Sequence, residues 1–180
     1  LFINLKNFIN YDIYIVEYIN LNISNKIKSM SVKAGYSEKI KIAIIGCGRI
    51  FRNHIKSIFI HNDLCELVAI CDNNLERLDK AFSIIHEFRK EFSILETNVC
   101  KYKTDSDLFN DIKNNHLALD LIVLTTPSGL HPKQTIDAAN LGINVCSEKP
   151  MATTWEDGVK MLNVCNKKKV KLFVVKQNRF

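Results

Sequence analysis

The feature that most limits the possible folds is a regular alternation of apolar runs and helix-like segments, which begins at residue 39. Short runs rich in Ile, Val and Leu predict buried strands, and the segments between them repeat their apolar residues at helical spacing. We expect strands at 39–45, 64–71, 100–102, 119–124, 143–146 and 170–175, and helices at 49–61, 75–92, 106–114, 131–141 and 155–166.

Continuous apolar strands joined by helices are typical of a parallel sheet covered on both faces. Crossovers between parallel strands are nearly always right-handed, which favours a doubly wound arrangement. With 180 residues, 47% of them hydrophobic, the chain is long enough for one core of this kind. The predicted fold class is therefore α/β, a Rossmann-type doubly wound parallel sheet over residues 37–180.

Residues 1–36 read as an atypical N-terminal extension. Residues 1–29 are crowded with Asn, Ile and Tyr, contain no Gly, Pro or Ala, and begin with Leu. They lack the basic start and small-residue cleavage site of a secretory signal. Our hypothesis is that Met30 is the natural start. A transit peptide is the alternative, although Asp12, Glu17 and the lack of Arg count against it.

The net charge of +6 raises the question of nucleic-acid binding. The basic residues are scattered, however, and the densest group, 167–169, lies between a helical and a strand pattern, where lysines favour a helix C-terminus. No uninterrupted apolar run reaches the roughly 18 residues of a membrane helix. We therefore expect neither nucleic-acid binding nor a membrane span.

The six cysteines indicate free thiols. No two of them are spaced as C-x-x-C, and the five histidines offer no zinc-like pairing. Cys71 and Cys146 lie inside apolar runs, where buried free thiols are ordinary. The pattern predicts a reducing, cytoplasmic compartment and no metal site.

A glycine turn follows the first predicted strand. Gly46 permits a tight turn, and Gly48 allows the backbone to approach a diphosphate at the N-terminus of the next helix. Phe51 stands where this fingerprint has a third Gly or Ala, so we expect it to shift the helix or point outward. An ordinary strand-to-helix turn is the alternative reading.

Asp72 ends the second predicted strand. A carboxylate there accepts hydrogen bonds from the adenosine ribose and repels a 2′-phosphate, which favours NAD over NADP. Arg49 and Arg77 offer some charge to a phosphate. The alternative for Asp72 is a solvated strand end or a helix N-cap.

Two further polar segments follow the fourth and fifth strands: 125–131 (Thr-Thr-Pro-Ser-Gly-Leu-His) and 147–150 (Ser-Glu-Lys-Pro). Open α/β sheets bind ligands at the carboxyl ends of their strands, so both segments predict a crevice. His131 as a simple helix-start residue, and Lys149 as a surface lysine, are the alternatives.

With these segments in place, the chain resembles the Gfo/Idh/MocA oxidoreductase family over about residues 39–180. The resemblance is carried by the turn 46–50, by 126–131 and by Glu-Lys-Pro at 148–150. Segments 148–158 and 173–179 look like members that oxidise the 3-hydroxyl of a UDP-N-acetylhexosaminuronic acid, such as UDP-N-acetylglucosaminuronic acid, for bacterial surface polysaccharide.

The resemblance implies NAD as cofactor and a cis bond before Pro150. Lys149 would be the catalytic group, beside the nicotinamide ribose and the substrate hydroxyl, where an ammonium stabilises alkoxide character. Lys149, Asn178 and Arg179 would contact substrate. The expected cofactor-binding residues are Gly46, Cys47, Gly48, Arg49, Ile50, Asp72, Thr125, Thr126, Pro127, His131, Glu148, Lys149 and Gln177.

The resemblance also implies a second domain, which supplies an Asp-x-x-x-His pair with a general base and the sheet used to form homo-oligomers. That substrate domain is absent from these 180 residues. We therefore expect the chain to bind NAD without turning over a sugar nucleotide. A stand-alone NAD-binding module without catalysis is the alternative.

Overall fold

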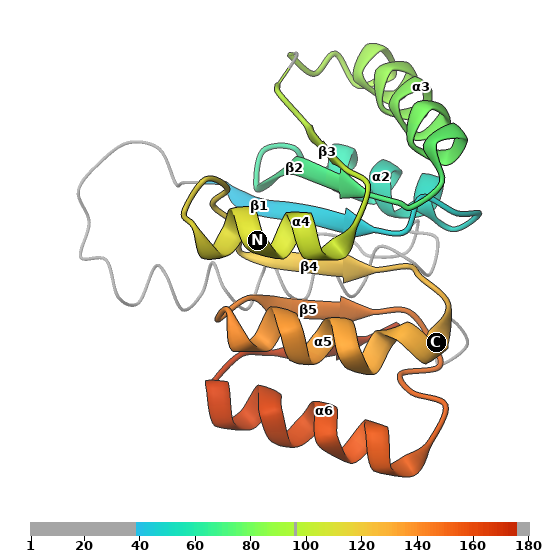
Figure 1. The fold of residues 1–180 in the computed structure, drawn as a ribbon. Helices are drawn as coiled ribbons and strands as arrows, with labels where there is room; N and C mark the ends of the chain where they lie inside the picture. Colours follow the sequence, from blue (N-terminus) through green and yellow to red (C-terminus); the bar gives the residue numbers. More distant parts are fainter. Residues whose placement is uncertain (1–38, 96, 176–180) are drawn as a thin grey trace, which may run out of the picture.

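Six strands form one sheet in the computed structural model, which describes residues 39–95 and 97–175 (Figure 1). The strand order is β3-β2-β1-β4-β5-β6, and each neighbouring pair is parallel. The order reverses between β1 and β4, which confirms the doubly wound Rossmann arrangement. The strands are β1 (Ile40–Ile45), β2 (Cys65–Cys71), β3 (Cys100–Tyr102), β4 (Leu121–Leu124), β5 (Asn144–Ser147) and β6 (Leu172–Val174).

The predicted helices are also confirmed, with ends within two residues of those expected. A short 3₁₀ turn, η2 (Ser128–Leu130), was not predicted. The α5 helix ends just before Gly142, whose φ of 78° suits the glycine stop expected there. The helices are α2 (Phe51–Ile60), α3 (Leu75–Glu91), α4 (Asp105–Lys113), α5 (His131–Asn140) and α6 (Trp155–Lys168).

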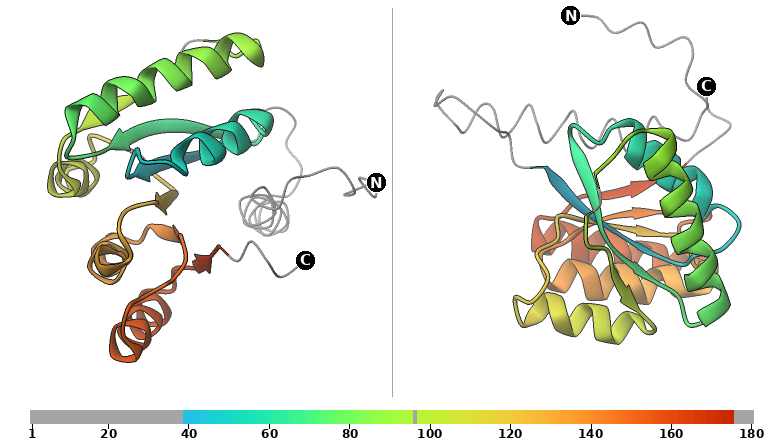
Figure 2. Two further views of the ribbon diagram at one scale, coloured as in Figure 1. Left: turned by 90° about the vertical axis from the view of Figure 1, so that its right-hand side faces the viewer. Right: turned by 90° about the horizontal axis from the view of Figure 1, so that it is seen from above.

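Both faces of the sheet are covered, because alternate residues of each strand point to opposite sides. Along β1, Ile42 and Ile44 pack with residues of α2 and α3. Ala43 and Ile45 pack on the other side with residues of α4 and α5. Figure 2 shows α6 beside α5 on this second face. The core therefore consists of two apolar layers, one on each face of the sheet. The central strands are covered on both faces.

Phe51 rules out one of the two arrangements that the sequence left open. It does not point outward, because its side chain is fully buried in the apolar layer with Ile55 and Ile58 of the same helix. A large ring thus fills the space between α2 and the sheet at the place where a small residue was expected.

Helix α2, like α5, begins without the side-chain cap that the other described helices have. Asn74, Thr104 and Thr154 cap α3, α4 and α6 by accepting a hydrogen bond from a backbone N–H three residues ahead. The N-cap of α2 is Ile50, which has no capping side chain. Its first turn is closed by backbone hydrogen bonds alone, from the N–H of Phe51 to Gly48 O (3.1 Å) and from the N–H of Asn53 to Ile50 O (3.0 Å), with no side-chain cap.

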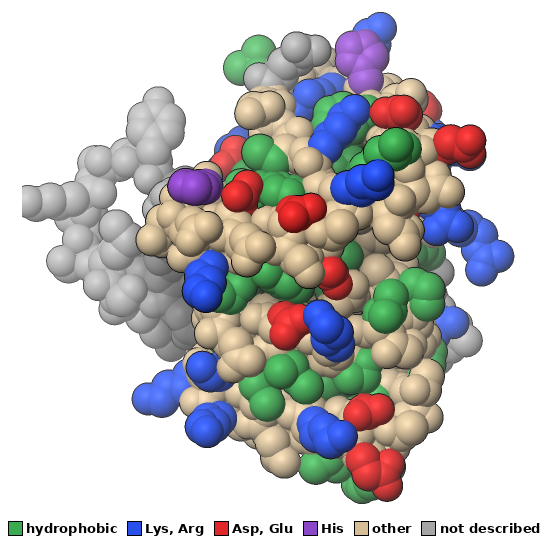
Figure 3. All heavy atoms as spheres, viewed as in Figure 1, with side chains coloured by type: hydrophobic (Ala, Val, Ile, Leu, Met, Phe, Trp, Pro, Cys, Tyr) green, Lys and Arg blue, Asp and Glu red, His purple; other side chains and the backbone are tan. Residues whose placement is uncertain are grey.

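The lysine run 167–169 lies where the sequence predicted. Lys167 and Lys168 are in the last turn of α6, and Lys169 ends the helix with a φ of 57°. On the face drawn in Figure 3, Lys and Arg side chains are interspersed with Asp and Glu. No helix among residues 39–95 and 97–175 has the length and apolar content that crossing a bilayer requires. The expectations for residues 1–36 lie outside the described residues.

Candidate functional site

The candidate site lies at the edge of the sheet where the parallel strands end. Backbone hydrogen bonds continue one residue past each strand and bring Gly46, Asp72, Thr125 and Glu148 to this edge. The N–H groups of these residues donate to Cys71 O (2.7 Å), Tyr102 O (3.2 Å), Ile45 O (2.9 Å) and Leu124 O (2.9 Å). Four of the residues singled out in the sequence therefore share one edge.

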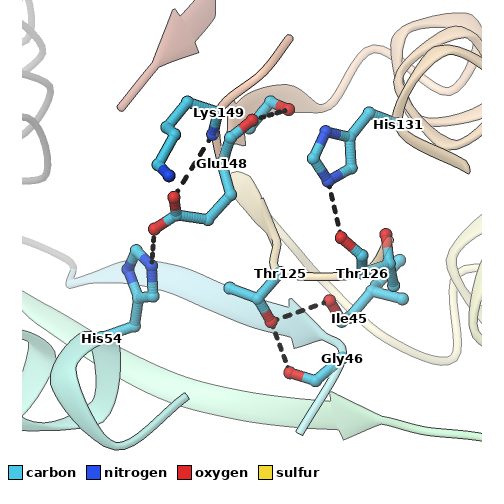
Figure 4. A network of polar contacts seen from close by, with 9 residues as sticks. Ile45, Gly46, His54, Thr125, Thr126, His131, Glu148 and Lys149 are labelled. Carbon is cyan, nitrogen blue, oxygen red and sulfur yellow. Dashed lines mark hydrogen bonds and ion pairs between the residues drawn. The ribbon is translucent and has the colours of Figure 1, made fainter. Parts of the chain in front are cut away.

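The first turn admits only glycine at its first position. Gly46 has a φ of 101°, and an added Cβ would lie 2.8 Å from the backbone carbon and oxygen of Thr125. The Thr125 hydroxyl lies against the carbonyl oxygens of Ile45 and Gly46, which ties β4 to this turn (Figure 4).

Gly48 lies on the open side of the same turn. A Cβ there would meet no atom within 4 Å, so the backbone faces open space beside the uncapped start of α2. A backbone turn that is open on this side, at the positive end of a helix dipole, fits the diphosphate of a dinucleotide. Arg49 is exposed next to this space, and Ile50 is the N-cap.

Asp72 holds the glycine turn from the neighbouring strand. One carboxylate oxygen accepts from the N–H of Cys47 at 2.7 Å, and the other accepts from the N–H of Asn74 at 2.9 Å. The N-cap of α3 is Asn74 and not Asp72, so the N-cap alternative is wrong. Asp72 is buried, and each of its carboxylate oxygens keeps a lone pair. A ligand bound at the turn can donate a hydrogen bond to it.

The thiol of Cys47 lies inside this turn and is not a nucleophile. Burial, and then the charge of Asp72, raise its pKa to about 12. The thiol is therefore protonated at neutral pH, and Cys47 contributes its backbone N–H to the turn.

His131 joins the two polar segments that follow β4 and β5. One ring nitrogen, Nε2, is 2.9 Å from Thr126 O, and the other, Nδ1, is 3.0 Å from Pro150 O. The side chain is fully buried, although His131 also begins α5 as the alternative reading had it. The ring thus fixes the spacing between the two loops. Pro127 is exposed at the start of η2.

Lys149 is exposed at the end of β5, and the peptide bond that joins it to Pro150 is cis, as the resemblance implied. Glu148, one residue earlier, is buried and accepts from the N–H of Lys149 at 3.3 Å. Its other oxygen lies 2.9 Å from Nε2 of His54, a buried residue of α2.

The charge of Glu148 is stabilised by these contacts. Burial alone would raise the pKa of its carboxyl, but the hydrogen bond and charge of His54, with the N–H and charge of Lys149, outweigh burial and lower it. Glu148 is therefore a carboxylate at neutral pH.

His54 is the site residue that sequence reasoning missed. In the sequence it shares helical spacing with Ile50 and Ile58, so it reads as part of an apolar helix face. The signal that was present is a histidine on a mostly apolar helix face, one turn after the glycine loop. Its partner lies 94 residues away, which no local pattern reveals.

The remaining expected site residues are Gln177, Asn178 and Arg179, and these lie outside the described residues. All six cysteines are free, and Cys71 and Cys146 are buried, as expected. No cluster of three or more potential metal ligands exists within residues 39–95 and 97–175. A cavity at the opposite edge of the sheet, lined by Lys41, Asp120 and Ile143 near the amino ends of β1, β4 and β5, is remote from this chemistry.

Comparison with known proteins gives one family and several relatives. Residues 40–176 match the family described as "Oxidoreductase family, NAD-binding Rossmann fold". The chain is similar to WlbA dehydrogenase from Bordetella pertussis in complex with NADH and UDP-GlcNAcA, with 44% identity and a TM-score of 0.66. It is also similar to WlbA from Chromobacterium violaceum, again with NADH and UDP-GlcNAcA, with 37% identity and a TM-score of 0.65.

These alignments cover most of this chain and a minor part of the relatives. They include 79% and 83% of this chain but 38% and 39% of the two WlbA chains. D-apiose dehydrogenase of Paraburkholderia graminis is 29% identical over 76% of this chain and 32% of its own length. The chain thus spans about a third of the curated relative and under two fifths of the solved structures.

Proposed function

Because this chain belongs to the Gfo/Idh/MocA oxidoreductases, as their NAD-binding Rossmann domain, we propose that it holds NAD across its strand ends and presents Lys149 to a sugar-nucleotide substrate. One observation carries the proposal. The glycine turn, the Asp72 carboxylate and the Lys149 loop converge at the same edge of the sheet, beside the point where the strand order reverses.

The diphosphate is proposed to lie at the glycine turn. The open backbone at Gly48 and the uncapped N-terminus of α2 offer N–H donors and the positive end of a helix dipole. Backbone at Cys47, Arg49 and Ile50 completes this turn. Asp72 keeps the turn in place through the N–H of Cys47, so its carboxylate has two tasks in this proposal.

The second task of Asp72 is to accept hydrogen bonds from the adenosine ribose hydroxyls. Each of its oxygens already accepts one backbone N–H and retains a lone pair for a hydroxyl. A 2′-phosphate at the same place would meet a buried negative charge, which supports NAD as the preferred coenzyme.

Replacing Asp72 with asparagine is expected to lower the preference for NADH over NADPH about 10–100-fold, the scale of one close charge interaction. Asparagine removes the negative charge and keeps one acceptor oxygen, which can serve the N–H of Cys47 but not that of Asn74 as well. Asp79→Ala, an exposed change on α3, is the matched control and should leave the ratio unchanged. Calorimetric titration of each variant with both coenzymes measures the ratio. An unaltered preference in Asp72→Asn would show that another residue selects the coenzyme.

On the nicotinamide side, we propose that Thr125, Thr126 and Pro127 line the ring. The Thr126 hydroxyl donates to Gln134 of α5, which orients the end of β4. His131 acts by fixing the carbonyls of Thr126 and Pro150, since both of its ring nitrogens face them. Glu148 supports the loop from its buried side.

Lys149 is the proposed catalytic residue. When bound, the coenzyme supplies the acceptor for a hydride from the carbon that bears the substrate hydroxyl. The hydroxyl proton passes to the general base proposed for the substrate domain. The Lys149 ammonium, exposed at the crevice, donates a hydrogen bond to that oxygen and stabilises the negative charge that develops on it. The buried Glu148 carboxylate beside it keeps a negative charge on the inner side of the loop.

We propose that the substrate is a UDP-N-acetylhexosaminuronic acid, oxidised at its 3-hydroxyl on the route to surface polysaccharide. The support is the likeness to two WlbA dehydrogenases that hold NADH and UDP-GlcNAcA. Lys149, Asn178 and Arg179 are the proposed substrate contacts of this domain, and a homo-oligomer is the proposed assembly of the whole protein. A cytoplasmic location is proposed because all six thiols are free.

The test is an assay of a protein that joins this domain to a substrate domain, with UDP-GlcNAcA and NAD⁺. The expected result is NADH formation followed at its near-ultraviolet absorbance, with the 3-keto sugar identified by mass spectrometry. Coenzyme binding with no reduction by any UDP-N-acetylhexosaminuronic acid would overturn the substrate assignment. It would favour a binding module without catalysis.

A further inference from the structure

A buried polar pair connects helix α2 to the end of β5. His54 is 1% exposed and Glu148 is 7% exposed, and their side chains meet at 2.9 Å. Because a carboxylate only accepts hydrogen bonds, Nε2 of His54 is the donor. The other ring nitrogen, Nδ1, is buried without a hydrogen-bond partner, so Glu148 is the polar group that orients the ring among the described residues.

The Glu148 carboxylate also contacts the backbone of Lys149. Its second oxygen accepts from the backbone N–H of Lys149, and the hydroxyl of Ser147 donates to the carbonyl of Glu148 at 3.0 Å. Figure 4 shows the Lys149 side chain extending on the same side as the Glu148 carboxylate and His54. Through one buried carboxylate, α2 therefore contacts the peptide that carries Lys149.

A buried carboxylate is stable only when it is paired. Three titratable groups face Glu148: His54 from α2, Lys149 from its own loop and the thiol of Cys146 from β5. The pKa of the Cys146 thiol is raised to about 12, chiefly by burial, so this neighbour is neutral. His54 is thus the only buried donor side chain among these groups that offsets the burial of the carboxylate.

We propose that His54 is a positioning residue of the hydride-transfer site, which acts through Glu148 to hold the loop and ammonium group of Lys149 at the crevice. This inference rests on the proposed function, because it assigns a task to Lys149. It predicts that His54 affects the nicotinamide half of the coenzyme and leaves the adenosine diphosphate half unaffected.

The test compares NADH with ADP as ligands of the purified chain and of four variants. His54→Leu removes the donor, whereas His54→Gln places an amide N–H near the position of Nε2. His54→Asn, with a shorter side chain, does not reach Glu148 and serves as the polar control. Glu148→Gln removes the carboxylate. Thermal melting by circular dichroism shows which variants fold.

We expect His54→Leu and His54→Asn to weaken NADH binding about tenfold, the scale of one charge-assisted hydrogen bond, and to leave ADP binding within about twofold. His54→Gln should retain most of the NADH affinity. If His54→Leu does not fold, the difference in NADH affinity between His54→Asn and His54→Gln tests the inference. Equal losses for NADH and ADP, or equal behaviour of Asn and Gln, would overturn the inference.

A pH titration adds a readout that a packing role would not change. In the wild-type chain the pKa of Glu148 is lowered, so its contacts persist as pH falls to acidic values and are lost only below its ordinary range. Without His54, burial is opposed only by Lys149 and the carboxyl takes up its proton at higher pH. As the pH is lowered, NADH binding by His54→Leu should therefore decline at a higher pH than that of the wild type, and binding by Glu148→Gln should not show this decline.

The outcomes separate the two proposals. If the folded wild-type chain binds ADP but not NADH, or neither ligand, the proposed function fails and this inference fails with it. If the wild-type chain binds NADH and the four variants do not follow the pattern above, the inference alone fails.

Discussion

Replacing Lys149 with methionine is expected to slow hydride transfer about 10²–10⁴-fold while the coenzyme still binds. Methionine has a similar length and apolar bulk, so the exposed loop at the end of β5 keeps its shape. The lost group is the ammonium that stabilises charge on the substrate oxygen as the hydride leaves. The loss should therefore fall mainly on kcat, measured as NADH formation by a protein that joins this domain to a substrate domain.

The matched control for this variant is Lys133→Met. Lys133 is an exposed residue of α5 that pairs with Asp137, and such surface pairs contribute little. Its activity should equal that of the wild type. A Lys149→Met enzyme with a kcat within about threefold of the wild type would contradict the catalytic assignment, because a positioned charge contributes much more than that.

The second large effect is expected from Gly46→Ala, which should destabilise the domain by about 3 kcal/mol and abolish coenzyme binding. Two costs add at this position. An alanine there must adopt a φ of 101°, and its Cβ would lie 2.8 Å from the backbone of Thr125. Relief of the overlap requires the turn to move away from β4, and the N–H groups of the turn then no longer converge.

Gly142→Ala separates these two costs. Gly142 also has a positive φ, of 78°, but an added Cβ would meet nothing within 4 Å. That variant should lose about 1 kcal/mol, the backbone cost alone, and should bind NADH normally. Urea denaturation and calorimetry of both variants measure the difference. Equal stability losses in the two variants would show that the contact with Thr125 is not the constraint.

The fold could be predicted from the sequence because the pattern of apolar residues that indicates it is local and recurs in successive elements. Each apolar run, such as that of β4, is buried on both sides by helices, so hydrophobic residues run without interruption and predict a strand. The position of Gly46, Asp72, Thr125 and Lys149 at one edge then followed from topology, since parallel strands end together.

The finer features of the site depend on contacts between distant residues. Phe51 was expected to shift the helix or to point outward because the glycine fingerprint has a small residue there, and the structure shows its ring buried between α2 and the sheet. The pairing of His54 with Glu148, and the contact of His131 with two carbonyls, join segments that the sequence keeps apart. The periodicity of apolar residues predicts individual helices and strands. It does not predict which residues of different elements form pairs.

Except for Lys149, the proposed substrate contacts of this domain lie after β6 in the sequence. Gln177, Asn178 and Arg179 come shortly after the end of β6 in the sequence, and their roles stay predictions. The description of the domain as NAD-binding depends instead on residues 40–176, which match the family.

Calorimetric titration of the purified, folded chain with NADH tests the central claim most directly, since the claim is that a dinucleotide lies across the strand ends. The account predicts saturable binding of one coenzyme per chain, lost in Gly46→Ala and retained in Lys149→Met. A chain that is folded by circular dichroism and takes up neither NADH nor NAD⁺ at millimolar concentration would contradict it.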